Sequence, residues 1–226
     1  MVKIVDSFAL ENDFDIIIPI CFKLDYKKGL SVHSYEITKS IADDFVGLYS
    51  GDPFACEAID YLCGSVEPII KKYNYHIDEN KKYGWIYNFY IDEINMLNVS
   101  LIQPETQKFN KNIKLNNLTD INTDIIIKQK LKMFVTVING NIVSFAHENS
   151  YYGEQDYIEI GTGTAQDYRD NGYAASNVAA LTRYILKKNK IVTYNCDKNN
   201  IRSRRVAEKA GFINDGKSYH LICYKN

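Results

Sequence analysis

The sequence predicts an α+β fold in which a mixed β-sheet is flanked by helices. Three observations in the second half of the chain favour this fold. Residues 131–138 and 142–147 are apolar runs joined by an Asn-Gly pair, which is typical of a tight β-hairpin. Residues 157–164 form a further expected strand, followed by a polar turn and a helix over about 172–188. Residues 191–196 then form a strand that we expect to lie parallel to 157–164, because strand-helix-strand crossovers pack in this way.

The first half of the chain carries weaker signals and is expected to form an N-terminal α/β extension, which either extends the sheet or covers part of the functional site. Gly64 and Pro68 are expected to divide residues 54–73 into two short helices, since proline removes a helical hydrogen bond. The other expected elements are strands at 14–20, 85–91 and 97–102 and a helix at 37–49. Residues 104–124 are polar and aperiodic, which places a domain boundary between 1–124 and 125–226.

The C-terminal end of the chain is expected to complete the sheet. Asn200 can cap a helix that runs to Ala210, and Gly211 suits the left-handed position that ends it. A final hairpin is expected from residues 212–214 and 219–224, with an Asp-Gly turn between them.

Composition excludes several classes of protein. The chain of 226 residues has a formal net charge of −1 and five scattered cysteines without a C-x-x-C pair, so we expect reduced thiols in a cytoplasmic protein and no metal site. The N-terminus carries acids where a signal peptide needs an apolar run. No stretch approaches the ~20 apolar residues of a membrane span, so we expect no membrane association. No nucleic-acid-binding motif is present.

Charge is distributed unevenly along the chain. Residues 1–60 hold eleven Asp and Glu against five Lys, whereas residues 181–226 hold eleven Lys and Arg against three Asp and Glu. Solvated surface explains both ends. Alternatively, the basic end attracts a phosphorylated ligand and the acidic end attracts a cation.

The segment after the expected strand 157–164 has the chemistry of an anion site. Gly172, Ala174 and Ala175 keep bulky side chains away from the first turn of the following helix. The first backbone N–H groups of a helix lack partners and carry a partial positive charge. An anion can therefore bind at this helix N-terminus.

Three blocks of sequence, in order, carry a resemblance to a known family. Arg169 to Ala174 fits the pattern Gln/Arg-x-x-Gly-x-Gly/Ala, and the strand 157–164 precedes it. The segment 200–212 follows, beginning with Asn and ending with Gly-Phe. On these blocks, residues 125–226 resemble the GNAT superfamily of acyl-CoA-dependent N-acyltransferases.

The resemblance implies a GNAT-type sheet and acetyl-CoA as cosubstrate. It implies that the turn holds the pyrophosphate of coenzyme A through main-chain N–H groups, and that backbone groups at Gly163 and Thr164 face the thioester carbonyl. Asn200 can touch the pantetheine arm, although a role as helix cap explains it equally well. Tyr173 packs either beside the cofactor or in the core. The expected cofactor-binding residues are Gly163, Thr164, Arg169, Asp170, Asn171, Gly172, Tyr173, Ala174 and Asn200.

The resemblance also implies catalytic residues. Glu159 matches a position that some members use as general base. A base is needed because an alkylammonium with a pKa of about 10 must lose a proton before attack. A solvated or ion-paired glutamate is the structural alternative, and Glu148 and His147 are reserves. The family's late helix often carries a tyrosine that protonates the departing sulfur, but Ala207 stands at that position. Ser203, one turn earlier, is the candidate for contact with the thiol, or else a packing hydroxyl.

The implied function is transfer of an acetyl or short acyl group from coenzyme A to a primary amine by direct attack on the thioester. The part of the functional site that the N-terminal extension can cover is then the site of the amine acceptor. Because the tyrosine is missing, a non-catalytic acyl-CoA-binding sensor or regulatory domain is the alternative. A generic nucleotide-binding domain is disfavoured, since the turn lacks the Gly-Lys-Ser/Thr ending of a P-loop. The sequence does not identify the acceptor: small amines, antibiotics, amino acids and protein N-termini fit equally well.

Overall fold

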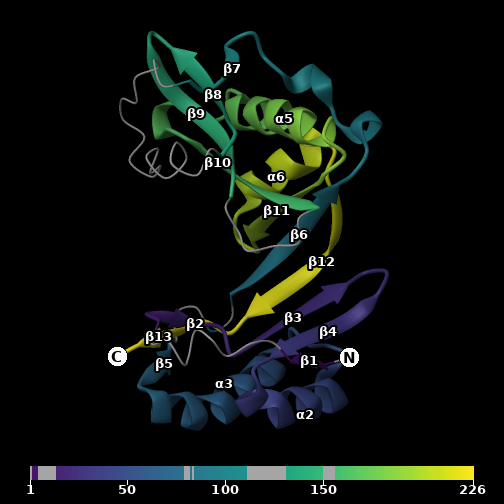
Figure 1. Ribbon diagram of the computed structural model, residues 1–226, viewed down its shortest axis with the longest axis vertical. Helices are drawn as coiled ribbons and strands as arrows, with labels where there is room; N and C mark the ends of the chain where they lie inside the picture. The colour runs from purple at the N-terminus through teal and green to yellow at the C-terminus, as the bar shows by residue number, and fades with distance from the viewer. Residues whose placement is uncertain (1, 5–13, 79–81, 83, 111–130, 150–155) are drawn as a thin grey trace. The chain divides into compact units, whose positions relative to one another are not determined.

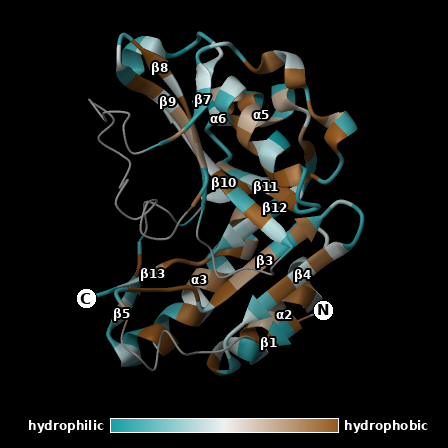
Figure 2. Cartoon of the chain, turned by 45° about the horizontal axis from the view of Figure 1, so that its top comes forward, coloured by the Kyte–Doolittle hydropathy of each residue, from teal (hydrophilic) through white to brown (hydrophobic). Residues whose placement is uncertain are grey.

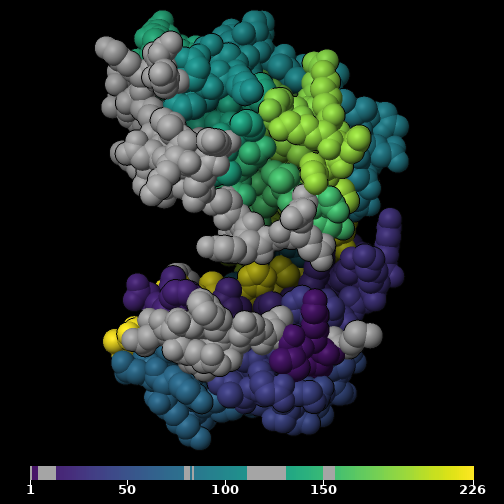
Figure 3. Space-filling model, viewed as in Figure 1, coloured from purple at the N-terminus to yellow at the C-terminus, as the bar shows by residue number. Residues whose placement is uncertain are grey.

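The computed structural model describes residues 2–4, 14–78, 82, 84–110, 131–149 and 156–226 (Figure 1). The chain forms two compact units. Unit 1 comprises Met1–Tyr87, Asp197–Asn199 and Asp215–Asn226, and unit 2 comprises Asn88–Cys196 and Asn200–Asn214. In Figure 3, N-terminal residues in purple to blue and C-terminal residues in yellow both contribute to the surface of unit 1. The expected boundary between residues 124 and 125 lies outside the described residues and stays a prediction.

Among the described residues, unit 1 contains two β-sheets, a larger and a smaller one, and two α-helices. Its strands are β1 Val2–Ile4, β2 Ile16–Ile17, β3 Ile20–Asp25, β4 Gly29–Ser34, β5 Tyr75–Ile77, β12 Ile213–His220 (from residue 215) and β13 Cys223–Lys225. The larger sheet runs in the order β1-β4-β3-β12, and the smaller in the order β2-β13-β5. Helices α2 (Lys39–Tyr49) and α3 (Cys56–Ile70) cover one face of the larger sheet (Figure 1).

The core of unit 1 is rich in aromatic rings. Phe22 on β3 lies 5.0 Å from the ring of Phe45 on α2 and 5.3 Å from that of Tyr219 on β12, measured between ring centroids. All three side chains are buried. Burial of this much apolar surface stabilises the unit by about 25 cal/mol per Å² removed from water.

Two expectations for the first part of the chain need correction. Residues 14–20 form not one strand but the whole of β2 and the first residue of β3, with Pro19 between them. The carbonyl of Pro19 accepts hydrogen bonds from Tyr35 N and Thr38 Oγ1. The segment 54–73 contains one α-helix rather than two, because α3 (Cys56–Ile70) continues through both Gly64 and Pro68 and is followed by a 3₁₀ turn at Lys71–Tyr73. Pro68 lies near the helix end, and the continuous buried stripe of α3 outweighs the one hydrogen bond that it removes. The helix expected at 37–49 is confirmed as α2, preceded by a 3₁₀ turn at Glu36–Thr38.

Unit 2 contains the mixed sheet. Its strands are β6 Trp85–Ile91 (from residue 88), β7 Thr106–Lys108, β8 Met133–Ile138, β9 Asn141–Glu148, β10 Tyr157–Thr164 and β11 Ile191–Asp197 (to residue 196), in the order β6-β11-β10-β9-β8-β7. Helices α5 (Tyr173–Leu186) and α6 (Ile201–Ala210) flank it (Figure 1). Hydrophobic residues on β8 and β9 form part of its core (Figure 2).

The expected topology of unit 2 is confirmed. Strands β8, β9 and β10 form an antiparallel meander, and β10 and β11 pair in parallel across α5. The hairpin turn has φ angles of 49° at Asn139 and 79° at Gly140, as a type I′ turn requires. The connection expected at 151–155 lies outside the described residues. Helix α5 is buried on most sides, since the polar residues Ser176, Asn177 and Thr182 are buried together with its apolar residues.

Two further expectations were wrong. Residues 97–102 form not a strand but a 3₁₀ turn, η4 (Val99–Leu101), which follows η3 (Ile94–Met96). The N–H of Asn98 donates to the carbonyl of Ala210, so this loop follows the end of α6 instead of a sheet edge. The segment 212–224 contains no Asp-Gly hairpin, because β12 runs straight through both residues. A Cβ built at Gly216 would overlap the carbonyl oxygen of Leu24, so this glycine permits close strand approach rather than a turn.

Candidate active site

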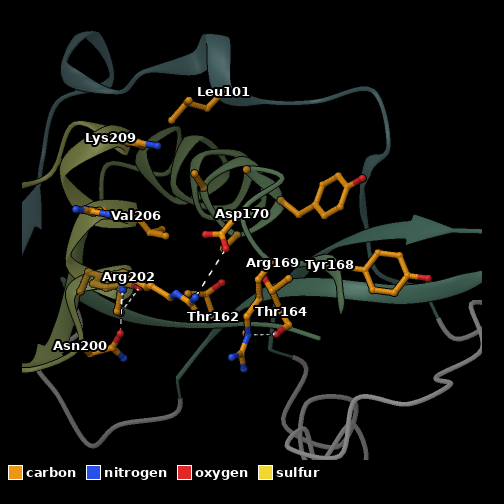
Figure 4. A pocket seen from close by; sticks show the side chains of 18 residues that line it. Leu101, Thr162, Thr164, Tyr168, Arg169, Asp170, Asn200, Arg202, Val206 and Lys209 are labelled. Carbon is orange, nitrogen blue, oxygen red and sulfur yellow. Dashed lines mark hydrogen bonds and ion pairs between the residues drawn. The ribbon is translucent and has the colours of Figure 1, made fainter. Parts of the chain in front are cut away.

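Unit 2 contains a cavity of about 750 Å³ at the end of β10, where α5 begins (Figure 4). Strand β10, the turn after it, the first turn of α5 and one face of α6 form its walls. The lining residues are Leu101, Thr162, Gly163, Thr164, Tyr168, Arg169, Asp170, Gly172, Tyr173, Ala174, Ala175, Tyr194, Asn200, Arg202, Ser203, Arg205, Val206 and Lys209.

The cavity lies where β10 and β11 separate. Their parallel register contains three pairs and ends at Glu159 and Thr193, within the described residues. Strand β10 continues from residue 160 to 164 paired with β9 alone. One edge of β10 is therefore free of β11 along the part that reaches the cavity.

The register with β9 determines which peptide groups of β10 lie on that free edge. Glu159 O accepts a bond from Asn149 N, and Ala165 N donates to Val143 O, so these pairs are the hydrogen-bonded ones. Hydrogen-bonded and non-bonded pairs alternate in an antiparallel ladder. The peptide groups of residues 161 and 163 thus point to β9, whereas those of residues 162 and 164 point toward the free edge.

The turn between β10 and α5 is held open by its own backbone. Asp170 and Gly172 have left-handed φ angles of 66° and 80°. The side-chain amide of Asn171 donates to the backbone carbonyls of Tyr168 and Arg169 at 3.3 and 3.1 Å, and these bonds stabilise the turn. The Gln103 amide in turn donates to the carbonyl of Asn171 at 3.0 Å. Asn171 therefore supports the turn without lining the cavity.

The first turn of α5 presents unpaired backbone donors. The first helical bond runs from Ser176 N to Gly172 O at 3.0 Å. The N–H groups of Tyr173, Ala174 and Ala175 precede this bond and have no partner in the part of the chain that the structure describes. These N–H groups and the helix dipole make the wall of the cavity attractive to an anion.

Cationic side chains surround the same wall. Arg169 donates from Nε to the carbonyl of Thr164 at 3.3 Å, and Arg202, Arg205 and Lys209 project from α6. The three α6 residues recur at a helical spacing that places them on one face. Asp170 is the one acidic residue among the lining residues, and it faces Arg202 at 3.8 Å (Figure 4). The cavity thus carries a positive excess.

A pair of hydroxyl groups lies deeper in the cavity wall. The hydroxyl of Tyr194 on β11 lies 2.7 Å from Ser203 Oγ on α6. Burial raises the pKa of Tyr194 to about 12. Asn200 caps α6 by accepting from Ser203 N at 3.0 Å, which confirms its expected role as a cap. Ala207 is fully buried and does not line the cavity.

Glu159 lies on β10 outside the cavity lining. Its carboxylate accepts one bond from the amide of Asn149 at 3.1 Å and one from the amide of Asn195 at 3.3 Å. Of the reserve residues, His147 Nδ1 contacts the carbonyl of Glu148 at 2.8 Å, and the Glu148 carboxylate accepts from Lys132 N at 2.8 Å.

The structure brings nine of the eleven expected site residues to one cavity. They are Gly163, Thr164, Arg169, Asp170, Gly172, Tyr173, Ala174, Asn200 and Ser203; Asn171 and Glu159 are the other two. Sequence reasoning missed Tyr194, and it pointed to the basic C-terminal end of the chain without naming the cations of α6. The helical spacing of Arg202, Arg205 and Lys209 could have predicted that these cations share one face of α6. No comparable pattern marks Tyr194.

Other kinds of site find less support. No group of three or more His, Cys, Asp or Glu side chains is arranged to hold a metal ion among the residues that the structure describes. No helix in the described ranges is both long and apolar enough to cross a membrane.

Comparison with known proteins agrees with this geometry. The family model described as GNAT acetyltransferase matches residues 133–221. A putative GNAT acetyltransferase from Novosphingobium aromaticivorans has a similar structure, with 14% identity over 68% of each chain and a TM-score of 0.51. A Drosophila protein superposes with a TM-score of 0.51 at 11% identity, over 73% of this chain and 57% of its own length. No curated protein sequence matches the chain. Over residues 133–221 the chain resembles the GNAT acetyltransferase superfamily, and its mixed sheet flanked by helices is the GNAT fold.

Proposed function

We propose that the protein is an N-acyltransferase that moves an acetyl or other short acyl group from coenzyme A to a primary amine. The observation that carries the proposal is the cavity of unit 2. There, unpaired helix N–H groups and cationic side chains meet the free edge of β10. One end of this cavity suits phosphates, and the other offers main-chain donors to a carbonyl.

The pyrophosphate of coenzyme A is assigned to the N-terminus of α5. The N–H groups of Tyr173, Ala174 and Ala175 point to it, and each hydrogen bond to a charged group contributes about 1.5–3 kcal/mol. Arg169 and the α6 cations add long-range attraction for the phosphates. The resemblance to GNAT acetyltransferases, which use acetyl-CoA, supports this choice of ligand.

The thioester carbonyl is assigned to the free edge of β10. Thr162 and Thr164 line the cavity, and their peptide groups point away from β9. An N–H there can donate to the oxyanion that develops when an amine attacks the carbonyl carbon. One such donor lowers the barrier by about 3–4 kcal/mol in well-studied acyl transfer. Gly163 lines the cavity too, but its peptide group belongs to the ladder with β9.

Glu159 is the proposed general base and acts through water, since it lies on β10 outside the cavity lining. Two neutral amides, from Asn149 and Asn195, fix the orientation of its carboxylate. No cation forms an ion pair with it among the described residues. The negative charge of the carboxylate is therefore available to attract an ammonium ion.

The same proposal places the protein in the cytoplasm and assigns acceptor recognition to residues 1–124. Five free cysteines suit a reducing compartment. The acidic balance of residues 1–60 suits a cationic acceptor.

Two measurements test the proposal. Titration calorimetry with coenzyme A and acetyl-CoA tests the cavity, and release of free thiol from acetyl-CoA with a panel of amines tests catalysis. Binding together with amine-dependent thiol release supports the transferase. Binding without turnover across the panel would favour the sensor that the alanine at position 207 suggests, and absence of binding would refute both functions.

A further inference from the structure

A phenol reaches the cavity from an element that the family resemblance does not point to. The late helix α6 offers none, because it contains no tyrosine and the buried Ala207 stands at the position where the family often has one. Tyr194 lies on β11, one residue beyond Thr193, where the pairing with β10 ends. Its side chain lines the cavity from the strand side, facing α6.

This phenol is held rigidly. Tyr194 is 2% exposed, and its ring packs edge-on against Phe212 with centroids 5.9 Å apart. Its hydroxyl meets Ser203 Oγ at 2.7 Å, a normal distance for an O–H···O bond. Ser203 is itself fixed by the bond from its N–H to the side chain of Asn200.

Either hydroxyl can donate the hydrogen bond between them, and the phenol, as a stronger acid than an aliphatic alcohol, is the better donor. The raised pKa of Tyr194, about 12, keeps the phenol protonated at neutral pH. A thiol has a pKa of about 8.5, so a proton would not pass from this phenol to a departing thiolate. The phenol can still donate a hydrogen bond to Ser203. Hydrogen bonds arranged in series strengthen one another.

We propose that Tyr194 is a positioning residue that donates its hydroxyl hydrogen to Ser203 Oγ and thereby leaves the Ser203 hydroxyl free to donate to the departing sulfur of coenzyme A. This inference rests on the proposed function. When the C–S bond breaks, sulfur takes its electron pair, and the Ser203 hydroxyl stabilises that charge by a hydrogen bond. Both hydroxyls keep their protons, and the proton lost by the attacking nitrogen goes to the general base.

The test uses coenzyme A itself, so it needs no knowledge of the acceptor. The ultraviolet absorbance of bound thiolate is titrated against pH in the wild type, Tyr194→Phe, Ser203→Ala and the double variant. Bound thiol in the wild type should ionise at a pH about one unit lower than in either single variant, which is about tenfold more thiolate at fixed pH. The double variant should behave like Ser203→Ala alone, because Tyr194 acts through Ser203. Affinity for the neutral thiol, measured below its pKa, should stay within about twofold.

Tyr184→Phe is the matched control, since Tyr184 lies on α5 outside the cavity lining. It should titrate as the wild type does. The inference would be overturned if the thiol bound to Tyr194→Phe ionised at the same pH as the thiol bound to the wild type. It would also be overturned if the pKa shift in the double variant equalled the sum of the shifts in the two single variants. If the wild type fails to bind coenzyme A, the proposed function itself fails, which is a distinct result. Thermal melts of each variant identify any loss of folding, in which case Tyr194→Met serves as the second variant.

Discussion

Replacement of Gly172 by valine should weaken coenzyme A binding by more than its effect on the stability of the fold can explain. Gly172 has a φ of 80°, and a Cβ there would lie 3.2 Å from Nε2 of Gln103. A left-handed conformation is about 1–2 kcal/mol less stable for a non-glycine residue than for glycine, and the difference is larger for a β-branched residue. Valine therefore favours a negative φ, which rotates the peptide group that leads into α5.

The structure supplies a control with the same backbone strain. Gly140 has a φ of 79° in the β8–β9 hairpin, and nothing lies within 4 Å of a Cβ built there. Gly140→Val and Gly172→Val should thus lower the free energy of unfolding by similar amounts, about 1–3 kcal/mol, or a few degrees in Tm. Only Gly172→Val should also misdirect the α5 N–H groups. Loss of one hydrogen bond to phosphate costs about 1.5–3 kcal/mol, which weakens coenzyme A binding about 10- to 150-fold.

The assay is titration calorimetry with coenzyme A, paired with thermal unfolding of each variant. A Gly172→Val protein that melts like Gly140→Val but binds coenzyme A with the wild-type Kd would refute the assignment of the phosphates to this turn. Equal weakening of binding by both variants would show that general destabilisation, and not the turn, controls affinity.

Three more predictions follow from the structure. Arg205→Glu should weaken coenzyme A binding about tenfold and flatten its dependence on salt, because it reverses one charge on the cavity wall; calorimetry at several salt concentrations measures this. Glu159→Gln should lower amine acylation about 100-fold and leave the Kd of acetyl-CoA unchanged, and an equal loss of binding would contradict a role as base. Gly216→Ala should lower the free energy of unfolding by more than about 2 kcal/mol in denaturant titrations, because its Cβ meets the backbone of Leu24, whereas Gly51→Ala, in open space, should not.

The parts of the fold that could be predicted from the sequence are those whose cause is local. Asn139 and Gly140 adopt positive φ angles with little strain, so the hairpin was visible in two residues. The segments that misled have tertiary causes. An Asp-Gly pair at 215 and 216 is compatible with a turn until β3 is known to lie against it. Likewise, Pro68 breaks an isolated helix, but packing of the buried stripe of α3 holds this one together.

The same distinction holds in the candidate site. The turn from Arg169 to Gly172 was predictable because its glycine and its helix start are contiguous in sequence. Tyr194 was not, because nothing local marks one tyrosine among 18 as the one that faces a serine on the next helix. That contact depends on where β11 leaves β10.

Strand register also decides which main-chain groups of β10 are available for chemistry. The family resemblance implies that the backbone of Gly163 faces the thioester, but a Cβ at Gly163 would lie 2.5 Å from the ring of Phe145. That glycine therefore makes room for an aromatic side chain of β9, and its peptide group bonds to the same strand. The N–H groups of Thr162 and Thr164 are left for a ligand, whereas the carbonyl of Thr164 accepts from Arg169 Nε. A slip of one residue would exchange the two sets. The oxyanion donor of the proposed reaction is therefore a property of the β9–β10 pairing, which no pattern within residues 157–164 reveals.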